Sequence, residues 1–369
     1  LFWIAAALLV ATFLMGGPSR IHVHSLIILG PLSILACAAA LITLRREHVV
    51  ELKWLFAGFA AIFALATLHL APLPPGLWQA LAGRDELLAV DRLTGQKGLW
   101  RPLTVTPMNG WHALASLFAP LAILLFGAQL NREQLYRFLP VIILLGALSG
   151  LFGLLQVIGS PTGPLYLYQT TNNGSAVGLF ANRNHAALFL AIQFPLLALW
   201  ATQQSSDRKK QRARIAAAAI LALLLLPLIL VTGSRSGLIV SGLSLIASAL
   251  VYGASLFKQG GGTLPSGRKV QLIVLATASA IAVLIYLTLH FSRAESVRRV
   301  LNLSFDADSR ASFWPVCVEL FWKYFPLGSG SGSFVEVYQI AEPLALLDTD
   351  YLNHAHNDFL EIGITFGLP

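Results

Sequence analysis

Long apolar runs recur along the whole chain, and short polar segments separate them. A helix that crosses the ~30 Å hydrocarbon core of a bilayer needs about 20 residues, with about 17 as a practical minimum. Nine runs approach or exceed that length: residues 1–16, 21–44, 54–71, 111–130, 138–159, 185–201, 215–232, 236–257 and 270–290. A tenth run begins near His356, and we expect it to be a truncated span because both ends of the chain lie inside apolar runs.

The composition favours a membrane protein. Hydrophobic residues make up 56% of the chain and charged residues only 11%, with a mean hydropathy of +0.71. A soluble domain carries charge on roughly a quarter of its residues. The runs therefore predict an all-α, polytopic helical membrane protein with about ten spans. The two cysteines, Cys37 and Cys317, are far apart and predict neither a disulfide framework nor a ligand cluster.

Lysine and arginine are concentrated in every second loop between the apolar runs. Cytoplasmic loops of membrane proteins carry such an excess, so these loops should face the cytoplasm. The residues concerned are Arg45, Arg46, Arg132, Arg137, Arg208, Lys209, Lys210, Arg212, Arg214, Lys258, Arg268 and Lys269. The net charge of +8 follows from this pattern and does not indicate nucleic-acid binding. The loops 72–110, 160–184, 233–235 and 291–355 then face outward.

We expect three parts along the chain. Residues 1–290 form a transmembrane bundle of nine spans that includes the outer loop 72–110. Residues 291–355 form an outer loop domain, and residues 356–369 begin the truncated tenth span. Most polar residues that could bind a ligand or take part in catalysis fall in the loops predicted to face outward.

Within the outer loop domain, apolar residues recur at three- and four-residue spacing from Asp308 to Tyr324. This spacing predicts an amphipathic helix near residues 309–324, and its Phe and Trp content favours a position flat in the membrane interface. The following "FPLGSGSGSF" contains a proline and three glycines, which end the helix. It is either a flexible linker or a shaped backbone near a ligand.

Two arginines of the outer loops are candidates for binding an anion. Arg235 lies in "VTGSRSGLIV", where small residues on both sides let a bulky anion approach the guanidinium and nearby backbone N–H groups. Arg310 lies at the start of the predicted amphipathic helix, where free N–H groups and the helix dipole attract phosphate. Alternatively, Arg235 anchors its turn at the membrane interface, and Arg310 pairs with Asp306 or Asp308.

The run "GLFANRNHAALFL" places polar residues at the outer end of a predicted span. Asn182, Asn184 and His185 could bind sugar hydroxyls there. They could equally cap the helix and satisfy its first N–H groups, which is the better interpretation for any single residue.

The segment "HAHND" places two histidines and an aspartate at the head of the last apolar run. The spacing of His354, His356 and Asp358 matches the start of a dinuclear zinc motif, but that motif requires another histidine where the chain has Phe359. A general base is the better interpretation, because an imidazole can take a proton from an attacking hydroxyl. His354 and Asp358 are then candidates for adjusting the pKa of His356. Glu361 lies one turn after Asp358 and faces a similar direction.

Taken together and in this order, these motifs resemble the bacterial O-antigen ligase and O-antigen polymerase superfamily. His356 and Asn357, followed by nine residues and Gly367, resemble the family pattern of His, then Asn, Ser or Gln, nine residues and Gly-x-x-Gly. The segments "GSRSG", "FANRNHAA", "SRASFW" and "PLGSGSGSF" are also similar to that family. The resemblance covers roughly residues 140–369. The outer loop 72–110 is more similar to the exopolysaccharide-polymerase relatives.

The resemblance implies a GT-C-like, inverting and metal-independent glycosyltransferase without a cofactor, in the bacterial inner membrane with its site facing the periplasm. Its donor would be an undecaprenyl-pyrophosphate-linked glycan, and its acceptor either lipid A-core or another lipid-linked glycan. By the same resemblance, Arg235 and Arg310 would bind the pyrophosphate and His356 would activate the acceptor hydroxyl. Two alternatives stay open, a transporter or flippase of a lipid-linked anion and an outward-facing zinc hydrolase.

Overall fold

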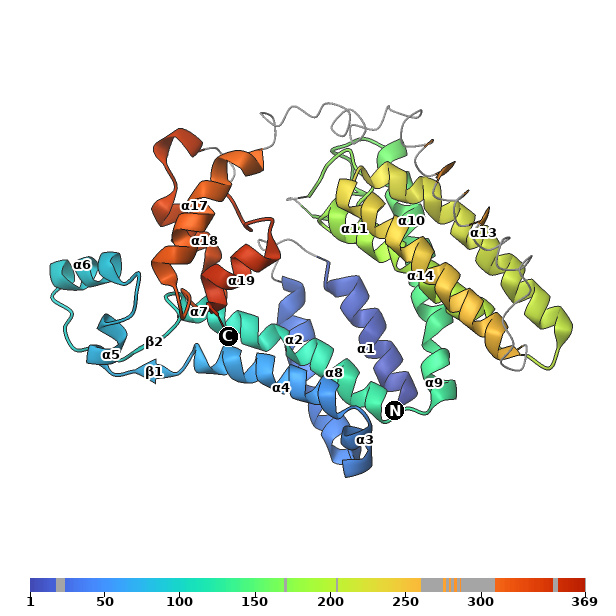
Figure 1. Cartoon of the computed structure of the whole chain (residues 1–369), viewed down its shortest axis with the longest axis horizontal. Helices are drawn as coiled ribbons and strands as arrows, with labels where there is room; N and C mark the ends of the chain where they lie inside the picture. The colour runs from blue at the N-terminus through green and yellow to red at the C-terminus, as the bar shows by residue number, and fades with distance from the viewer. Residues whose placement is uncertain are drawn as a thin grey trace. The chain divides into compact units, whose positions relative to one another are not determined.

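The computed structural model describes residues 1–17, 24–168, 171–203, 205–259, 309–347 and 351–368, with a few single positions between 275 and 286. The described part is mostly α-helical (Figure 1). Six helical segments are long and apolar enough to cross a membrane: Ser25–Thr43, Pro107–Ala128, Arg132–Ile158, Arg183–Ala201, Arg208–Thr232 and Arg235–Ser255. The prediction of a polytopic helical membrane protein is confirmed.

These six segments coincide with six of the predicted runs. The runs 1–16 and 54–71 form the shorter apolar helices α1 (Phe2–Met15) and α4 (Lys53–Leu68). The run 270–290 lies mostly outside the described residues. The last run contains α19 (Asp358–Phe366), a helix of nine residues. The expected total of about ten spans stays a prediction.

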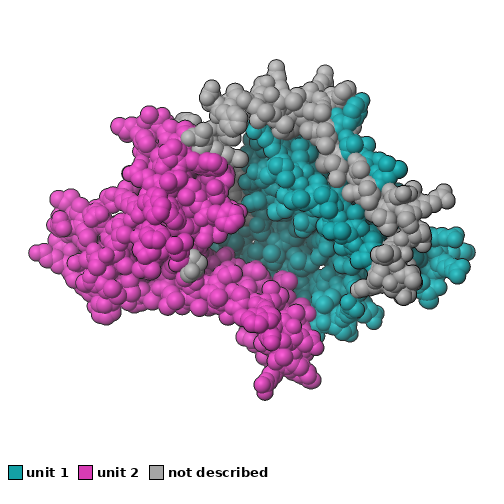
Figure 2. Space-filling view, in the orientation of Figure 1, with its two compact units in different colours: residues 1–36, 129–303 teal, residues 37–128, 304–369 magenta. Residues whose placement is uncertain are grey.

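The chain divides into two compact units, coloured separately in Figure 2. Unit 1 consists of residues 1–36 and 129–303, and unit 2 of residues 37–128 and 304–369. The helix α2 (His24–Thr43) runs across the boundary. Unit 2 therefore joins an early segment of the chain to the C-terminal segment that carries "HAHND".

Unit 1 is a helical bundle. Its helices are α1, α9 (Arg132–Tyr136), α10 (Phe138–Ile158), α11 (Arg183–Ala191), α12 (Gln193–Ala201), α13 (Arg208–Thr232) and α14 (Arg235–Gln259). Its core includes Leu139, Ile143, Leu190, Phe194, Leu197 and Ile229. Local signals set the helix ends: the Asp207 side chain accepts from the backbone N–H groups of Lys209 and Lys210 at the start of α13. Gly233, with a φ of 70°, ends the same helix.

A buried glutamine fixes the outer segment that leads into α11. Gln156 on α10 is 1% exposed. Its Oε1 accepts from the N–H groups of Val177 and Gly178, at 3.1 and 2.8 Å. Its Nε2 donates to the carbonyls of Leu165 and Gly178, both at 3.0 Å. All these bonds go to backbone groups, so the Gln156 side chain satisfies N–H and C=O groups that have no helix or strand partner in this segment.

Unit 2 combines apolar helices with the segments that the charge pattern predicts to face outward. Its elements are α3 (Arg46–Glu51), α4, β1 (Pro72–Leu73), α5 (Pro75–Gln79), α6 (Asp85–Thr94), β2 (Arg101–Pro102), α7 (Pro107–Ser116), α8 (Phe118–Ala128), α17 (Ser309–Tyr324), α18 (Phe334–Ala341), η2 (Leu344–Leu346) and α19. The two short strands pair antiparallel, with Pro72 opposite Pro102 and Leu73 opposite Arg101. This pairing closes the base of the loop 72–110.

The helix α17 forms where the spacing predicts it, but its apolar face points into protein. Phe313, Cys317, Leu320 and Tyr324 are buried in a core shared with α18 and α19. Spacing alone does not identify the surface that covers an apolar face. Trp314, Val318 and Trp322 of the same helix are exposed, and the expectation that the helix lies in the membrane interface stays a prediction. The surrounding burial, with a smaller contribution from the Glu361 carboxylate, raises the pKa of Cys317 to about 11.

A buried arginine connects the outer loop to α17. Arg84 is 1% exposed, and its Nη2 donates to the Leu103 carbonyl at 2.6 Å. Its guanidinium lies 5.7 Å from the ring centroids of both Trp78 and Tyr324. Burial lowers the pKa of Arg84, and Tyr324 acts in the opposite direction. Trp78 is itself buried, with its indole N–H on the Pro102 carbonyl, so it has no exposed face for a sugar.

The segment "PLGSGSGSF" is a fixed, buried loop rather than a flexible linker. Its three serines, Ser329, Ser331 and Ser333, are each 0% exposed. The N–H groups of Ser329 and Gly330 donate to the Ile364 and Thr365 carbonyls of α19, both at 2.8 Å. The loop therefore holds the end of the helix that follows "HAHND".

Glycine is required in this loop for close backbone approach. Gly330 has a φ of 106°, and a Cβ there would lie 2.2 Å from the Cα of Thr104. The next residue, Ser331, donates its N–H to Nδ1 of the buried His69 at 3.1 Å. The loop thus joins the start of the outer segment 72–110 to α19 inside unit 2.

Candidate functional site

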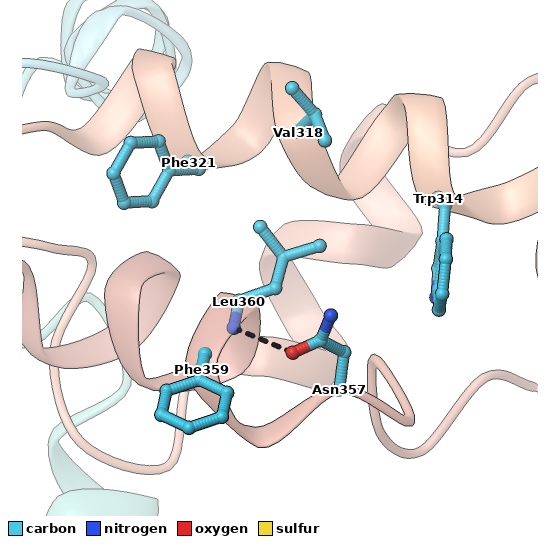
Figure 3. A pocket seen from close by; sticks show the side chains of 6 residues that line it. All are labelled: Trp314, Val318, Phe321, Asn357, Phe359 and Leu360. Carbon is cyan, nitrogen blue, oxygen red and sulfur yellow. Dashed lines mark hydrogen bonds between the residues drawn. The ribbon is translucent and has the colours of Figure 1, made fainter.

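The histidine turn, residues 354–357, precedes α19 in unit 2. Asn357 is the N-cap of α19, and its side chain accepts from the Leu360 N–H at 3.2 Å (Figure 3). His356 is exposed and has a φ of 51°, the one non-glycine residue with positive φ in the described chain. A residue other than glycine in this region costs about 1–3 kcal/mol and persists where surrounding contacts enforce it.

Glu361 provides those contacts from the first turns of α19. One carboxylate oxygen lies 2.8 Å from Nδ1 of His354, and the other accepts the Ala355 N–H at 2.9 Å. The Ala355 carbonyl in turn accepts from the Trp314 indole at 3.2 Å, and Ala355 is fully buried. Both backbone groups of Ala355, its N–H and its carbonyl, are therefore held by side chains, and we call this arrangement the clamp.

The clamp distinguishes the two histidines. His354 contacts Glu361, and the ring of His356 lies 6.1 Å, between centroids, from Phe313; both histidines are exposed. Asp358 is the first residue of α19 and is exposed, where its charge favours the helix N-terminus. The hydrogen bonds of Ala355 and Asn357 hold the backbone on both sides of the exposed His356, as positioning of a general base requires.

A bound metal ion requires several His, Cys, Asp or Glu side chains that converge on one point. Among the described residues, no group of three or more His, Cys, Asp and Glu side chains is placed to hold a metal. The nearest acidic partner of the histidine turn, Glu361, is occupied by hydrogen bonds to His354 and Ala355.

The arginine turn, residues 233–237, lies in unit 1 between α13 and α14. Arg235 is the first residue of α14 and is exposed. Ser234 is buried, and its hydroxyl donates to Oδ1 of Asn184 at 2.7 Å. The structure thus brings together two motifs, "GSRSG" and "FANRNHAA", that are about 50 residues apart.

The small residues around Arg235 serve helix packing. A Cβ on Gly237 would lie 2.4 Å from the Ala187 Cβ, so glycine lets α14 approach α11. The Gly237 N–H also donates to the Ser234 hydroxyl at 3.0 Å. The buried Ser234 and Gly237 thus fix the start of the helix from which Arg235 projects. That the small residues also admit an anion stays a prediction.

The polar run at the start of α11 contains a helix cap. Asn182 is the N-cap of α11 and accepts from the Asn184 N–H at 2.8 Å, as the capping interpretation predicts. His185 is exposed on the first turn.

Arg183 is a residue to which the sequence analysis assigned no role. It is half-buried and begins α11, as Arg235 begins the packed helix α14. The bond from Ser234 to Asn184 brings the starts of these two helices together, and each start carries one arginine. The signal in the sequence was an arginine directly after an Asn cap.

Arg310 is the second residue of α17 in unit 2. Its backbone is helical, in agreement with the predicted helix start, while its side chain lies outside the described part of the chain. The alternative partners Asp306 and Asp308 lie outside it too.

Comparison with known proteins gives one match. Residues 220–369 match the family model described as O-antigen ligase. The match includes Arg235, the start of α17 and the histidine turn with its spacing to Gly367, and it begins after the run that contains Asn182, Asn184 and His185. No curated protein and no solved structure matches the chain. The resemblance is confirmed over this segment: the chain is a multi-pass membrane protein whose residues 220–369 match the O-antigen ligase family model.

Proposed function

We propose that this protein transfers an undecaprenyl-pyrophosphate-linked glycan onto an acceptor hydroxyl at the periplasmic face of the bacterial inner membrane. The observation that carries the proposal is the O-antigen ligase match over a segment in which His356 stands exposed on a clamped turn. Members of that family act on lipid-linked glycans. The orientation rests on the distribution of lysine and arginine along the sequence.

In the proposed reaction, His356 removes the proton from the acceptor hydroxyl as its oxygen attacks the anomeric carbon of the donor. The bond between that carbon and the pyrophosphate oxygen breaks, the configuration inverts, and undecaprenyl pyrophosphate leaves. Arg235 and Arg310 would stabilise the charge that develops on the leaving group.

The remaining site residues have supporting roles in this proposal. Glu361, His354 and Asn357 hold the turn that presents His356. Asn184 fixes the arginine turn through Ser234. No step in this scheme needs a metal ion, and the overall architecture would be GT-C-like with about ten spans.

The test is transfer by the purified protein in nanodiscs. Undecaprenyl-pyrophosphate glycan is supplied with lipid A-core or with a second lipid-linked glycan, each with and without EDTA. Product on lipid A-core indicates a ligase, and longer lipid-linked chains indicate a polymerase. Loss of activity with EDTA would favour the zinc hydrolase class, and no product in any combination would favour a transporter.

A further inference from the structure

A groove lies between α17 and α19, directly beside the histidine turn. It measures about 440 Å³ and is lined by Trp314, Val318 and Phe321 from α17 and by Asn357, Phe359 and Leu360 from the start of α19 (Figure 3). Leu360 projects toward Val318 between the two helices (Figure 3). All of these residues belong to unit 2.

The groove is apolar and open to the outside. Phe359 is 91% exposed, Val318 46% and Trp314 42%. Asn357 is the one polar residue among the six that line the groove, and its amide oxygen already caps α19. An apolar lining of this kind suits a hydrocarbon chain, because burying apolar surface against it is favourable.

We infer that this groove binds the hydrocarbon chain of the polyprenyl donor, next to its pyrophosphate. The inference rests on the proposed function, because that donor joins its chain to the attacked carbon only through the pyrophosphate. The first isoprene units must therefore lie close to the general base, and Asn357, at one end of the groove, is bonded directly to His356.

The lining discriminates between a lipid chain and a sugar. A sugar ring presents several hydroxyls that need partners, and an unpaired polar group at a binding site is costly. The groove offers five apolar side chains and a single free amide nitrogen, from Asn357. Trp314 is held by its indole N–H on the Ala355 carbonyl, so its ring is a fixed wall of the groove.

The groove is tested by binding rather than by transfer. Phe359→Ser removes an exposed ring from the groove, and Leu93→Ser is the matched control, because Leu93 is 88% exposed on α6 of the same unit and lies outside the groove. The probes are undecaprenyl phosphate, inorganic pyrophosphate and the free oligosaccharide. We expect Phe359→Ser to weaken undecaprenyl phosphate binding about tenfold and to leave the other two probes unchanged.

A second measurement does not depend on a variant. A diazirine-bearing polyprenyl phosphate should label α17 near Val318 in the unmodified protein, and undecaprenyl phosphate should compete. Unchanged lipid affinity in Phe359→Ser, labelling confined to other helices, or weakened oligosaccharide binding would each overturn the inference; the last would indicate a sugar subsite. If the protein transfers glycan but Phe359→Ser binds the lipid normally, only the assignment of the groove is refuted. If Phe359→Ser weakens lipid binding but the unmodified protein transfers no glycan, only the proposed reaction is refuted.

Discussion

The arginine turn of unit 1 and the histidine turn of unit 2 are both helix starts, but they are stabilised differently. In the arginine turn, small buried residues let two helices pack, and Arg235 projects from an ordinary helical position. In the histidine turn, a carboxylate, an amide and an indole hold a backbone with positive φ at His356. Packing thus fixes the location of Arg235, whereas hydrogen bonds fix the backbone around His356.

The largest effect should come from removing the imidazole. His356→Asn keeps a residue that tolerates positive φ, so it removes the base without adding strain. We expect the rate of transfer to fall by about 10²–10⁴-fold, with normal membrane insertion. His112→Asn, an exposed histidine on α7 of the same unit, is the control and should retain activity. A variant within tenfold of the unmodified rate would exclude His356 as the base.

Arg235→Ala should have the next largest effect. Losing a cation that stabilises the leaving group is expected to reduce kcat by about 10²–10³-fold, and Arg235→Lys should recover only part of it because lysine lacks the bidentate fork. Thermal unfolding should stay unchanged, since Arg235 is exposed. Arg92→Ala on α6 provides the control. Full activity of Arg235→Lys would indicate a simple charge rather than a fork.

Glu361→Gln tests the clamp. A glutamine has one accepting oxygen and one donating nitrogen. With the Ala355 N–H on the oxygen, the side chain loses its charge and can contact His354 only by donating to an unprotonated Nδ1, while its size is kept. A looser turn should shift the His356 imidazole by a fraction of an ångström. We expect this shift to lower kcat about tenfold with little change in KM. Separate measurement of kcat and KM decides this, and an altered KM with unchanged kcat would assign Glu361 to substrate binding.

Gly237→Ala tests the packing role of the arginine turn. The new Cβ would lie 2.4 Å from the Ala187 Cβ, so the helices must shift, at a cost of about 1–3 kcal/mol in stability. Gly242→Ala, also on α14, has no atom within 4 Å of its added Cβ and should change stability by less than about 1 kcal/mol. Thermal unfolding in detergent compares the two. Equal melting temperatures would contradict the packing role.

Much of the helical layout could be predicted from the chain alone. The apolar runs identified the six long helices, and the spacing after Asp308 identified α17. The capping role of Asn182 was also predictable, because a cap depends on residues within one turn.

Other features of the candidate site could not be predicted. The bond from Ser234 to Asn184 joins segments 50 residues apart, and the clamp on Ala355 includes Trp314, 41 residues earlier. The buried face of α17 and the buried serines of the glycine-rich loop depend on elements of distant sequence. No local spacing carries such information.

The sequence by itself determined the membrane class, the helix positions and the order of the polar motifs, because hydropathy and capping act over a few residues. The tertiary structure alone decided which histidine is clamped, which serines are buried and where an apolar groove opens beside His356. The physical reason is that burial and hydrogen-bond partners are set by contacts between segments far apart in the chain, and these exist only once the units have packed.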